Sequence, residues 1–280
     1  MIKKIVKILV WTLIVSYLVF ALVFVADKRK KVKCTSIDIQ IVDTTNNYFI
    51  DREDVLQMIS DRGEQLINKD IEDINIAKLE ELLINHPSIK NAEVFKDMDG
   101  ELKIEIEQRN PIIRIINYNG ESYYIDEDAR LMQLSENYTA RVLVATGDIN
   151  EPLSRLKKVC LTDTLTMQDL VKRTILPDLY KLAKYIYDDK FFKAMIEQIY
   201  VKQDGSYELI SKIGNNLIEL GDTTDYKDKF TNLKAVYEKG FPTVGWNQYD
   251  TINIKYKNQV ICTKKVIYES EPESTDSISH

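Results

Sequence analysis

An uninterrupted apolar run near the start of the chain is its most constraining feature. Residues 8–26 carry no charged side chain, and the seven residues before them include three lysines. A helix needs about 20 apolar residues to cross a bilayer, and this run reaches that length with Ile5 and Val6. A cleaved signal peptide is the alternative, but its apolar region is shorter and ends in small residues. The run leads instead into the basic residues 28–31, so we predict an uncleaved transmembrane anchor.

Charges on the two sides of the run leave its orientation open. Three lysines precede it, whereas four lysines and one arginine lie within residues 28–33. The positive-inside rule therefore mildly favours a cytoplasmic position for the body of the protein. Large domains are translocated largely regardless of flanking charge, so the count does not decide the orientation.

Composition excludes several classes of protein. The net charge of -6 argues against a nucleic-acid partner, and the basic residues 28–33 suit contact with lipid head groups. Cys34, Cys160 and Cys262 form neither a disulfide framework nor a zinc site, although a Cys160–Cys262 bridge is left open. We expect no cofactor, no metal and no small-molecule substrate, because the chain lacks the phosphate-loop, nucleophile-elbow and zinc-protease motifs.

Periodicity predicts a compact unit over residues 36–110. Its first segment alternates apolar and polar residues, which is typical of a half-buried strand. Asp51 can cap a helix, Pro87 ends a second helix, and an Asp-Gly turn joins two final strands. We therefore expect the order strand, helix, helix, strand, strand over residues 36–43, 51–63, 75–87, 92–95 and 101–108.

The rest of the chain is predicted to be mainly a sheet. Short strands between turn residues are expected at 112–116, 123–126, 141–146, 196–201, 207–211, 217–220, 251–256 and 259–264. Apolar residues at helical spacing predict helices over residues 176–186 and 230–237. We divide the chain into a leader (1–7), an anchor (8–26), a basic linker (27–35), a first domain (36–110), a second domain (111–267) and a disordered acidic tail (268–280).

Several short motifs occur in a fixed order along the chain. The run Leu79-x-x-x-Leu83-x-x-x-Pro87-x-Ile89, followed by the alternating Leu102-x-Ile104-x-Ile106, resembles a POTRA domain. Later motifs are similar to landmarks of the bacterial cell-division family FtsQ/DivIB: Tyr124-Ile125-Asp126, Leu220-Gly221-Asp222, Lys229-Phe230-x-x-Leu233 and Ile252-Asn253-Ile254-Lys255-Tyr256. The chain departs from this pattern at Ser88, where the family often has an aromatic residue, and at Ala129, where it often has glycine.

The resemblance implies an α+β protein with a transmembrane helix, a POTRA domain and a mainly antiparallel β domain with flanking helices. It also implies a non-enzymatic scaffold of the division machinery, the divisome. Such a scaffold lies at the septum in the inner (cytoplasmic) membrane, with its N terminus cytoplasmic and its bulk extracytoplasmic. The implied partners are small single-span proteins of the FtsB and FtsL type, bound mainly by the second domain. Other divisome components would dock on the POTRA domain through its own sheet edge.

We predict that the final strand carries the partner-binding residues. Tyr256 would be an aromatic anchor, Asn258 and Gln259 would form hydrogen bonds, and Val260 would pack against the partner. The alternative is that Tyr256 packs inside its own domain, and the sequence does not choose between the two. We expect no catalytic residue.

Two other functions remain as alternatives. A POTRA-type periplasmic chaperone for secreted or outer-membrane proteins would normally have tandem POTRA domains or a C-terminal barrel, and the sequence shows neither repeats nor barrel strands. An anchored cell-wall enzyme would need a site assembled from scattered carboxylates, which sequence alone cannot identify.

Overall fold

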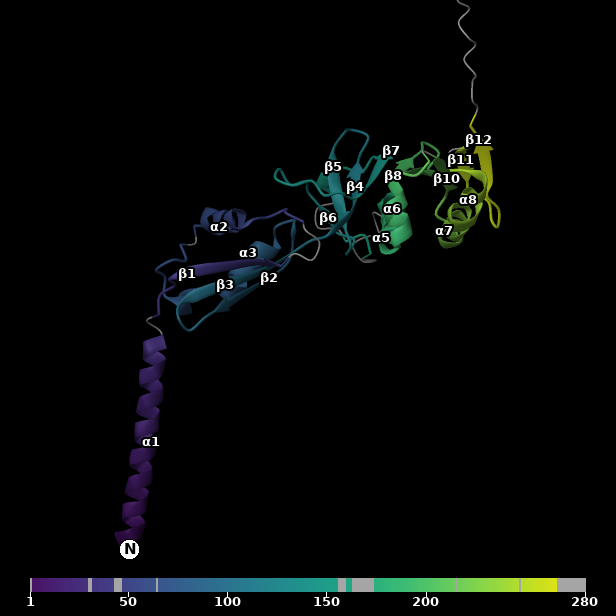
Figure 1. The fold of residues 1–280 in the computed structure, drawn as a ribbon. Helices are drawn as coiled ribbons and strands as arrows, with labels where there is room; N and C mark the ends of the chain where they lie inside the picture. Colours follow the sequence, from purple (N-terminus) through teal and green to yellow (C-terminus); the bar gives the residue numbers. More distant parts are fainter. Residues whose placement is uncertain are drawn as a thin grey trace, which may run out of the picture. The chain divides into compact units, whose positions relative to one another are not determined.

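The computed structural model describes residues 2–29, 32–42, 47–63, 65–155, 160–162, 174–214, 216–246 and 248–265. The predicted anchor lies within α1 (Ile2–Arg29), a single long helix in Figure 1. Its segment Lys4–Phe24 is long and apolar enough to cross a membrane, and side chains such as Trp11 and Phe20 are exposed along it. Large apolar side chains exposed along a helix of this length are favourable in lipid and unfavourable in water. The predicted acidic tail lies outside the described residues.

The chain folds as two compact units. The first contains Met1–Asn110 and Met132–Ala140, and the second contains Pro111–Leu131 and Arg141–His280. A short segment that follows the first strands of the second unit therefore packs with the first unit. The periodicity of the sequence did not predict that residues 132–140 belong to the first unit.

The first unit is a three-stranded sheet with two helices, in the predicted order. Its elements are β1 (Ser36–Val42), α2 (Arg52–Asp61), α3 (Ile76–Ile84), β2 (Ile89–Lys96) and β3 (Glu101–Gln108). In the sheet order β1-β3-β2, the strand β1 runs parallel to β3 and β2 runs antiparallel to it. The central strand buries Leu102, Ile104 and Ile106, while Val55 of α2 and Leu83 of α3 are also fully buried.

Side-chain caps start both helices of the first unit. The Asp51 carboxylate accepts the Asp54 N–H at 2.8 Å, and the Asp54 carboxylate accepts the Asp51 N–H at 3.0 Å. This reciprocal capping box confirms Asp51 as the predicted cap. The Asn75 side chain accepts the Lys78 N–H at 3.1 Å and begins α3. Each cap contributes about 1 kcal/mol to stability.

We expect His86 to make the first unit sensitive to acid. Its Nδ1 accepts the Ser88 N–H at 3.3 Å, and burial lowers the pKa of the imidazole although Asp54 acts in the opposite direction. Folding therefore favours the neutral ring, so stability falls as the pH drops below the unfolded pKa of about 6.5 toward the lowered value. We expect H86N to reduce the stability lost between about pH 7.5 and pH 5.5. Hydrogen exchange of the β3 amides at both pH values measures this, and an unchanged loss in the variant would contradict it.

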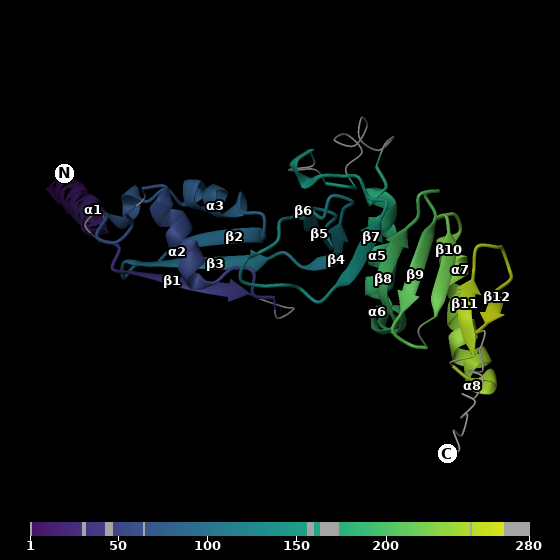
Figure 2. The same cartoon turned by 90° about the horizontal axis from the view of Figure 1, so that it is seen from above.

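The second unit contains a nine-stranded mixed sheet. Its strands are β4 (Pro111–Ile116), β5 (Ser122–Asp126), β6 (Leu131–Met132), β7 (Leu143–Gly147), β8 (Ile196–Val201), β9 (Tyr207–Ser211), β10 (Leu217–Gly221), β11 (Tyr249–Asn253) and β12 (Ile261–Lys264). Their order is β12-β11-β10-β9-β8-β7-β4-β5-β6, and Figure 2 shows β7 to β12 in sequence. The pairs β4·β7, β7·β8 and β10·β11 are parallel, and the pairs β4·β5, β8·β9, β9·β10 and β11·β12 are antiparallel. The predicted mainly antiparallel sheet is confirmed, and it also contains three parallel pairs.

Helices cover this sheet along the crossovers that parallel pairing requires. They are α5 (Leu176–Asp188), α6 (Lys190–Met195), α7 (Tyr226–Ala235) and α8 (Phe241–Val244), with a π-helical turn at Val236–Gly240 and a 3-10 turn at Leu153–Arg155. The predicted apolar face of α5 is buried: Leu176, Leu179, Leu182, Ala183 and Ile186. Parallel strands need a long connection, so α5 and α6 precede β8, and α7 and α8 precede β11.

The sequence did not predict α6, α8 or β6, and it placed α7 too late. Asp189 explains α6, because this residue ends α5 and its side chain accepts the Phe191 N–H at 2.8 Å to begin the next helix. Phe192 of α6 is buried. A helix of six residues is too short for a hydrophobic period to be read from sequence.

Ala129 adopts a left-handed backbone with φ 62°, a conformation that favours glycine. The turn forms around Asp126, whose Oδ1 accepts the N–H groups of Asp128 at 3.0 Å and of Arg130 at 2.7 Å. These two bonds hold the turn despite the steric cost of a side chain there.

All three cysteines are free thiols, so the possible Cys160–Cys262 bridge is not formed. Cys34 is buried, and burial raises the pKa of its thiol and of the Cys262 thiol. A raised pKa lowers the thiolate fraction and makes both groups poor nucleophiles.

Candidate partner-binding site

The predicted partner-binding residues lie in the connection between the last two strands. Strand β11 ends at Asn253 and β12 begins at Ile261, so the predicted strands 251–256 and 259–264 were too long. The Asn253 side chain accepts the Lys255 N–H at 3.0 Å and turns the backbone out of the sheet. The residues that precede β12 instead of lying in it are Tyr256, Asn258, Gln259 and Val260.

Side-chain exposure separates these residues. Tyr256 is 52% exposed, so the alternative that it packs inside its own domain was wrong. Asn258 and Gln259 are exposed as well, and Asn258 has a left-handed backbone with φ 61°. Val260 is half-buried and packs against the core of the second unit. Ile261, the first residue of β12, is 47% exposed and was missed by sequence reasoning, because a strand of four residues shows no clear alternation.

Strand β12 is an edge of the sheet. In the part of the chain that the structure describes, it pairs with β11 alone, with Ile252 opposite Cys262 and Asn253 opposite Ile261. An edge strand presents backbone N–H and C=O groups along its outer side. An incoming extended segment can pair with these groups, while exposed side chains select which segment binds.

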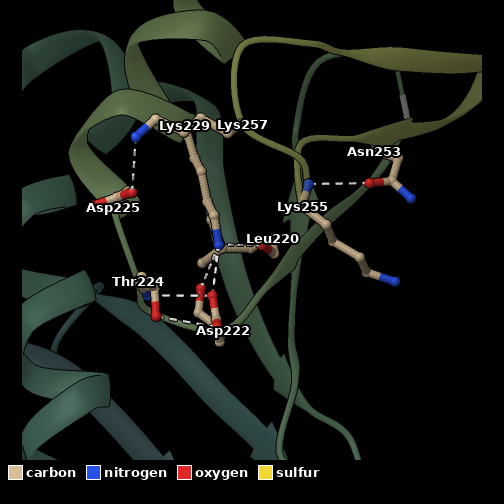
Figure 3. Close-up of polar contacts among 8 residues, drawn as sticks. All are labelled: Leu220, Asp222, Thr224, Asp225, Lys229, Asn253, Lys255 and Lys257. Atoms are coloured by element: carbon tan, nitrogen blue, oxygen red, sulfur yellow. Dashed lines mark hydrogen bonds and ion pairs between the residues drawn. The ribbon is translucent and has the colours of Figure 1, made fainter.

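Lys229 of α7 fixes the end of β10 beside this connection. It is only 7% exposed, and its Nζ donates to Leu220 O at 3.2 Å, Asp222 O at 2.9 Å and Asp222 Oδ1 at 2.8 Å (Figure 3). An ammonium group has three N–H donors, so these acceptors satisfy it completely. Phe230 and Leu233 of the same helix are fully buried and hold α7 against the sheet.

The Asp222 carboxylate is the charged partner in this arrangement. Its bond to Lys229 is the main reason that the pKa of the carboxyl is lowered, and Thr224 contributes through its N–H at 3.2 Å and its hydroxyl at 3.1 Å. In the sequence, Lys229 and Asp222 belong to short motifs, and no role could be assigned to either residue. The structure pairs them, and the sequence signal was a lysine directly before the apolar positions 230 and 233.

A second polar link joins β10 to the chain after β11. Glu219 of β10 accepts from Asn253 Nδ2 at 2.6 Å and pairs with Lys255 Nζ at 3.0 Å. Its backbone oxygen accepts the Ile254 N–H at 3.0 Å. Figure 3 shows Asn253, the last residue of β11, and Lys255 in the connection after it. These side-chain and backbone bonds to Glu219 therefore hold the start of the connection that carries Tyr256.

The chemistry available here suits binding. Among the described residues, no group of three or more His, Cys, Asp or Glu side chains could hold a metal ion. A pocket of about 180 Å³ beside Tyr256 is lined by both acidic and basic side chains: Asp222, Asp225, Asp228, Lys229, Lys255 and Lys257. These charges balance, so the exposed tyrosine and the strand edge are the distinguishing features of this surface.

Comparison with known proteins agrees with this architecture. The family model described as "FtsQ/DivIB, C-terminal related" matches residues 110–263, and a POTRA-like domain model matches residues 32–107. A search of individual curated proteins found no match. The first match covers more than half of the chain and contains the whole candidate site. The chain therefore belongs to the FtsQ/DivIB family of bacterial cell-division proteins, with a POTRA-like first domain.

Proposed function

We propose that this protein is a non-enzymatic, membrane-anchored scaffold of the bacterial division machinery that links early and late components at the septum. Its second domain binds small single-span proteins of the FtsB and FtsL type. The observation that carries this proposal is the exposed edge strand β12, preceded by Tyr256 and beginning with Ile261. Membership of a family of non-enzymatic division proteins supports it.

Binding in this proposal occurs by strand addition. A segment of the partner pairs with the outer side of β12, and the Tyr256 ring and the Ile261 side chain lie against partner side chains. Aromatic residues are common anchors in interfaces because they bury a large area with few rotatable bonds. Asn258 and Gln259 contribute hydrogen bonds at the rim.

The proposed orientation places the N terminus in the cytoplasm and both compact units outside it. Family membership and the size of the folded body support this orientation, since large domains cross the membrane despite flanking positive charge. The anchor then places the two units at the outer face of the cytoplasmic membrane. There they can meet other single-span proteins.

Substitution at the edge strand tests the partner site. We expect I261E and Y256A each to weaken capture of an FtsB/FtsL-type partner by about tenfold or more, because each removes an exposed anchor. Y200A is the matched control: Tyr200 is 42% exposed on β8, which three strands separate from β12. Binding is measured with the full-length chain in detergent micelles, and equal affinities for all three variants would contradict the proposal.

V260E is a less discriminating variant. It is also expected to weaken capture, but Val260 packs against the core, so a charge there would lower stability as well. I261E introduces the same charge at an exposed position and leaves the core intact. Reduced capture by I261E at unchanged melting temperature therefore assigns the effect to the interface.

Photo-crosslinking in living cells identifies the partner class. A photoreactive residue at position 256 is expected to capture small single-span division proteins. Capture of secreted or outer-membrane clients would instead favour a POTRA-type chaperone. Hydrolysis of cell-wall material by the purified protein would favour an anchored wall enzyme.

A further inference from the structure

The first unit contains a cavity of about 320 Å³ that the partner site of the second unit does not use. Ligand pockets in proteins have volumes of about 300 to 1,000 Å³, so this one can take a single side chain or a small molecule. Three pieces of chain form its wall: the segment 49–61, which contains α2, the turn 86–88 between α3 and β2, and the segment 133–137.

Contacts within the first unit hold this cavity open. Gln108 of β3 accepts the N–H groups of Phe49 at 3.0 Å and Ile50 at 3.2 Å, which fixes the chain that leads into α2. On the other side, the Ser135 hydroxyl donates to Phe49 O at 3.4 Å, and the rings of Phe49 and Tyr138 meet edge to face with centroids 5.0 Å apart. The cavity is therefore preformed, which limits the ordering cost of binding.

Among the residues that the structure describes, the wall contains three acidic side chains and no lysine or arginine. Asp54, Asp61 and Glu136 line the cavity, and one Asp54 oxygen is used by the helix cap. The side chains of Asp61 and Glu136 have no hydrogen-bond or ion-pair partner in the ranges that the structure describes. Three carboxylates beside a single histidine, His86, whose pKa is lowered by burial, create a local negative potential that favours a cation.

Ser88 adds a hydroxyl group to the wall of the cavity. It is 4% exposed and lines the cavity, its N–H donates to His86, and its carbonyl accepts the Arg109 N–H at 2.9 Å. Its hydroxyl has no partner among the described residues. The hydroxyl is not among the fully buried polar atoms that lack a partner, so it is accessible from the cavity and offers a ligand one acceptor and one donor.

The rest of the wall combines apolar side chains with the polar residues Gln57, His86, Gln133, Ser135 and Asn137. Phe49, Met58, Pro87 and Leu134 offer a surface for methylene groups, next to the acidic and hydroxyl groups. A side chain with an aliphatic stem and a cationic end with several donors matches both parts of the wall. Arginine fits better than lysine, because its planar guanidinium has five donors that can reach separate acceptors at once.

We propose that this cavity binds an arginine side chain of a partner protein. The guanidinium donates to Asp61, Glu136 and the Ser88 hydroxyl, and its stem packs on Met58 and Leu134. The first unit then carries a docking site of its own, separate from the strand edge of the second unit.

Methyl NMR of the full-length chain in detergent micelles tests the proposal. The chain has six methionines, and the Met58 methyl group lines the cavity, whereas Met98 and Met195 serve as internal references. The probes are acetylated Gly-Gly-Arg-Gly-Gly amide and the same peptide with citrulline, which has the shape of arginine without its charge. We expect the arginine peptide to shift the Met58 resonance saturably and the citrulline peptide to bind at least about tenfold more weakly.

Two double variants with equal loss of charge separate the cavity from general electrostatics. D61N/E136Q is expected to weaken binding of the arginine peptide by about tenfold, whereas D73N/E81Q, outside the wall, leaves it unchanged. An unchanged melting temperature shows that each variant is folded. A Met58 resonance that stays fixed with about 10 mM peptide, or that responds equally to citrulline, overturns the proposal.

Discussion

G147A is expected to destabilise the second unit by about 3 to 5 kcal/mol, since it combines overpacking with an unfavourable backbone conformation. Gly147 ends β7 with φ 104°, a region that side chains rarely adopt. A Cβ there would lie 2.8 Å from the Val201 nitrogen and 2.9 Å from its carbonyl carbon, and closer still to its oxygen. These atoms are backbone of the neighbouring strand β8, so the strands must separate to admit a methyl group.

The matched control is G205A. Gly205 also has a positive φ of 78°, but a Cβ there would meet nothing within 4 Å. Its substitution therefore costs only the conformational penalty, about 1 kcal/mol. Urea unfolding of both variants measures the difference. A G147A variant no less stable than G205A would show that the β7·β8 pair tolerates the methyl group.

K229M is expected to lower the stability of the second unit by about 2 to 3 kcal/mol, because it removes three hydrogen bonds from a buried ammonium group. The thioether cannot replace these bonds, so Leu220 O and Asp222 O lose a donor. For a unit of this size, we expect the melting temperature to fall by about 5 °C or more. The loss also loosens the chain beside Tyr256, so capture of a partner should weaken.

K227M is the control for K229M, since Lys227 lies two residues earlier on α7 and is exposed. We expect its effect to stay within about 0.5 kcal/mol.

The pH dependence of stability gives a second test of the ion pair between Lys229 and Asp222. The lowered pKa of Asp222 means that the stabilisation is present above the unfolded pKa of about 3.9 and is lost as the pH falls through the lowered value. K229M should lose less stability than the unmodified protein as the pH falls. An equal loss of stability in the variant and the unmodified protein would exclude the ion pair as its cause.

Local sequence predicted much of the secondary structure. Alternating residues located β1 and β3, Asp51 located the start of α2, and the spacing of apolar residues from 176 to 186 located the buried face of α5. These features depend on neighbours a few positions apart, so the sequence contains them directly. The short elements α6, α8 and β6 were missed because too few residues carry the pattern.

The candidate site was only partly predictable. The sequence located the segment around Tyr256, but it placed Tyr256 in one strand and Gln259 and Val260 in the next, whereas all three lie between β11 and β12. The strand ends early because the Asn253 side chain bonds to the Lys255 N–H, and such a local bond competes with sheet pairing. Ile261 was recognised as a candidate binding residue only from its exposure in the structure.

The sequence by itself determined the anchor, the order of the main elements and the family, because composition, periodicity and ordered motifs are properties of the chain alone. The tertiary structure decided which strands pair in parallel, that Lys229 is buried on Leu220 and Asp222, and that residues 132–140 complete an acidic cavity in the first unit. Each of these features depends on contacts between groups far apart in the chain, which form only when the whole core packs. A local sequence pattern therefore does not predict them.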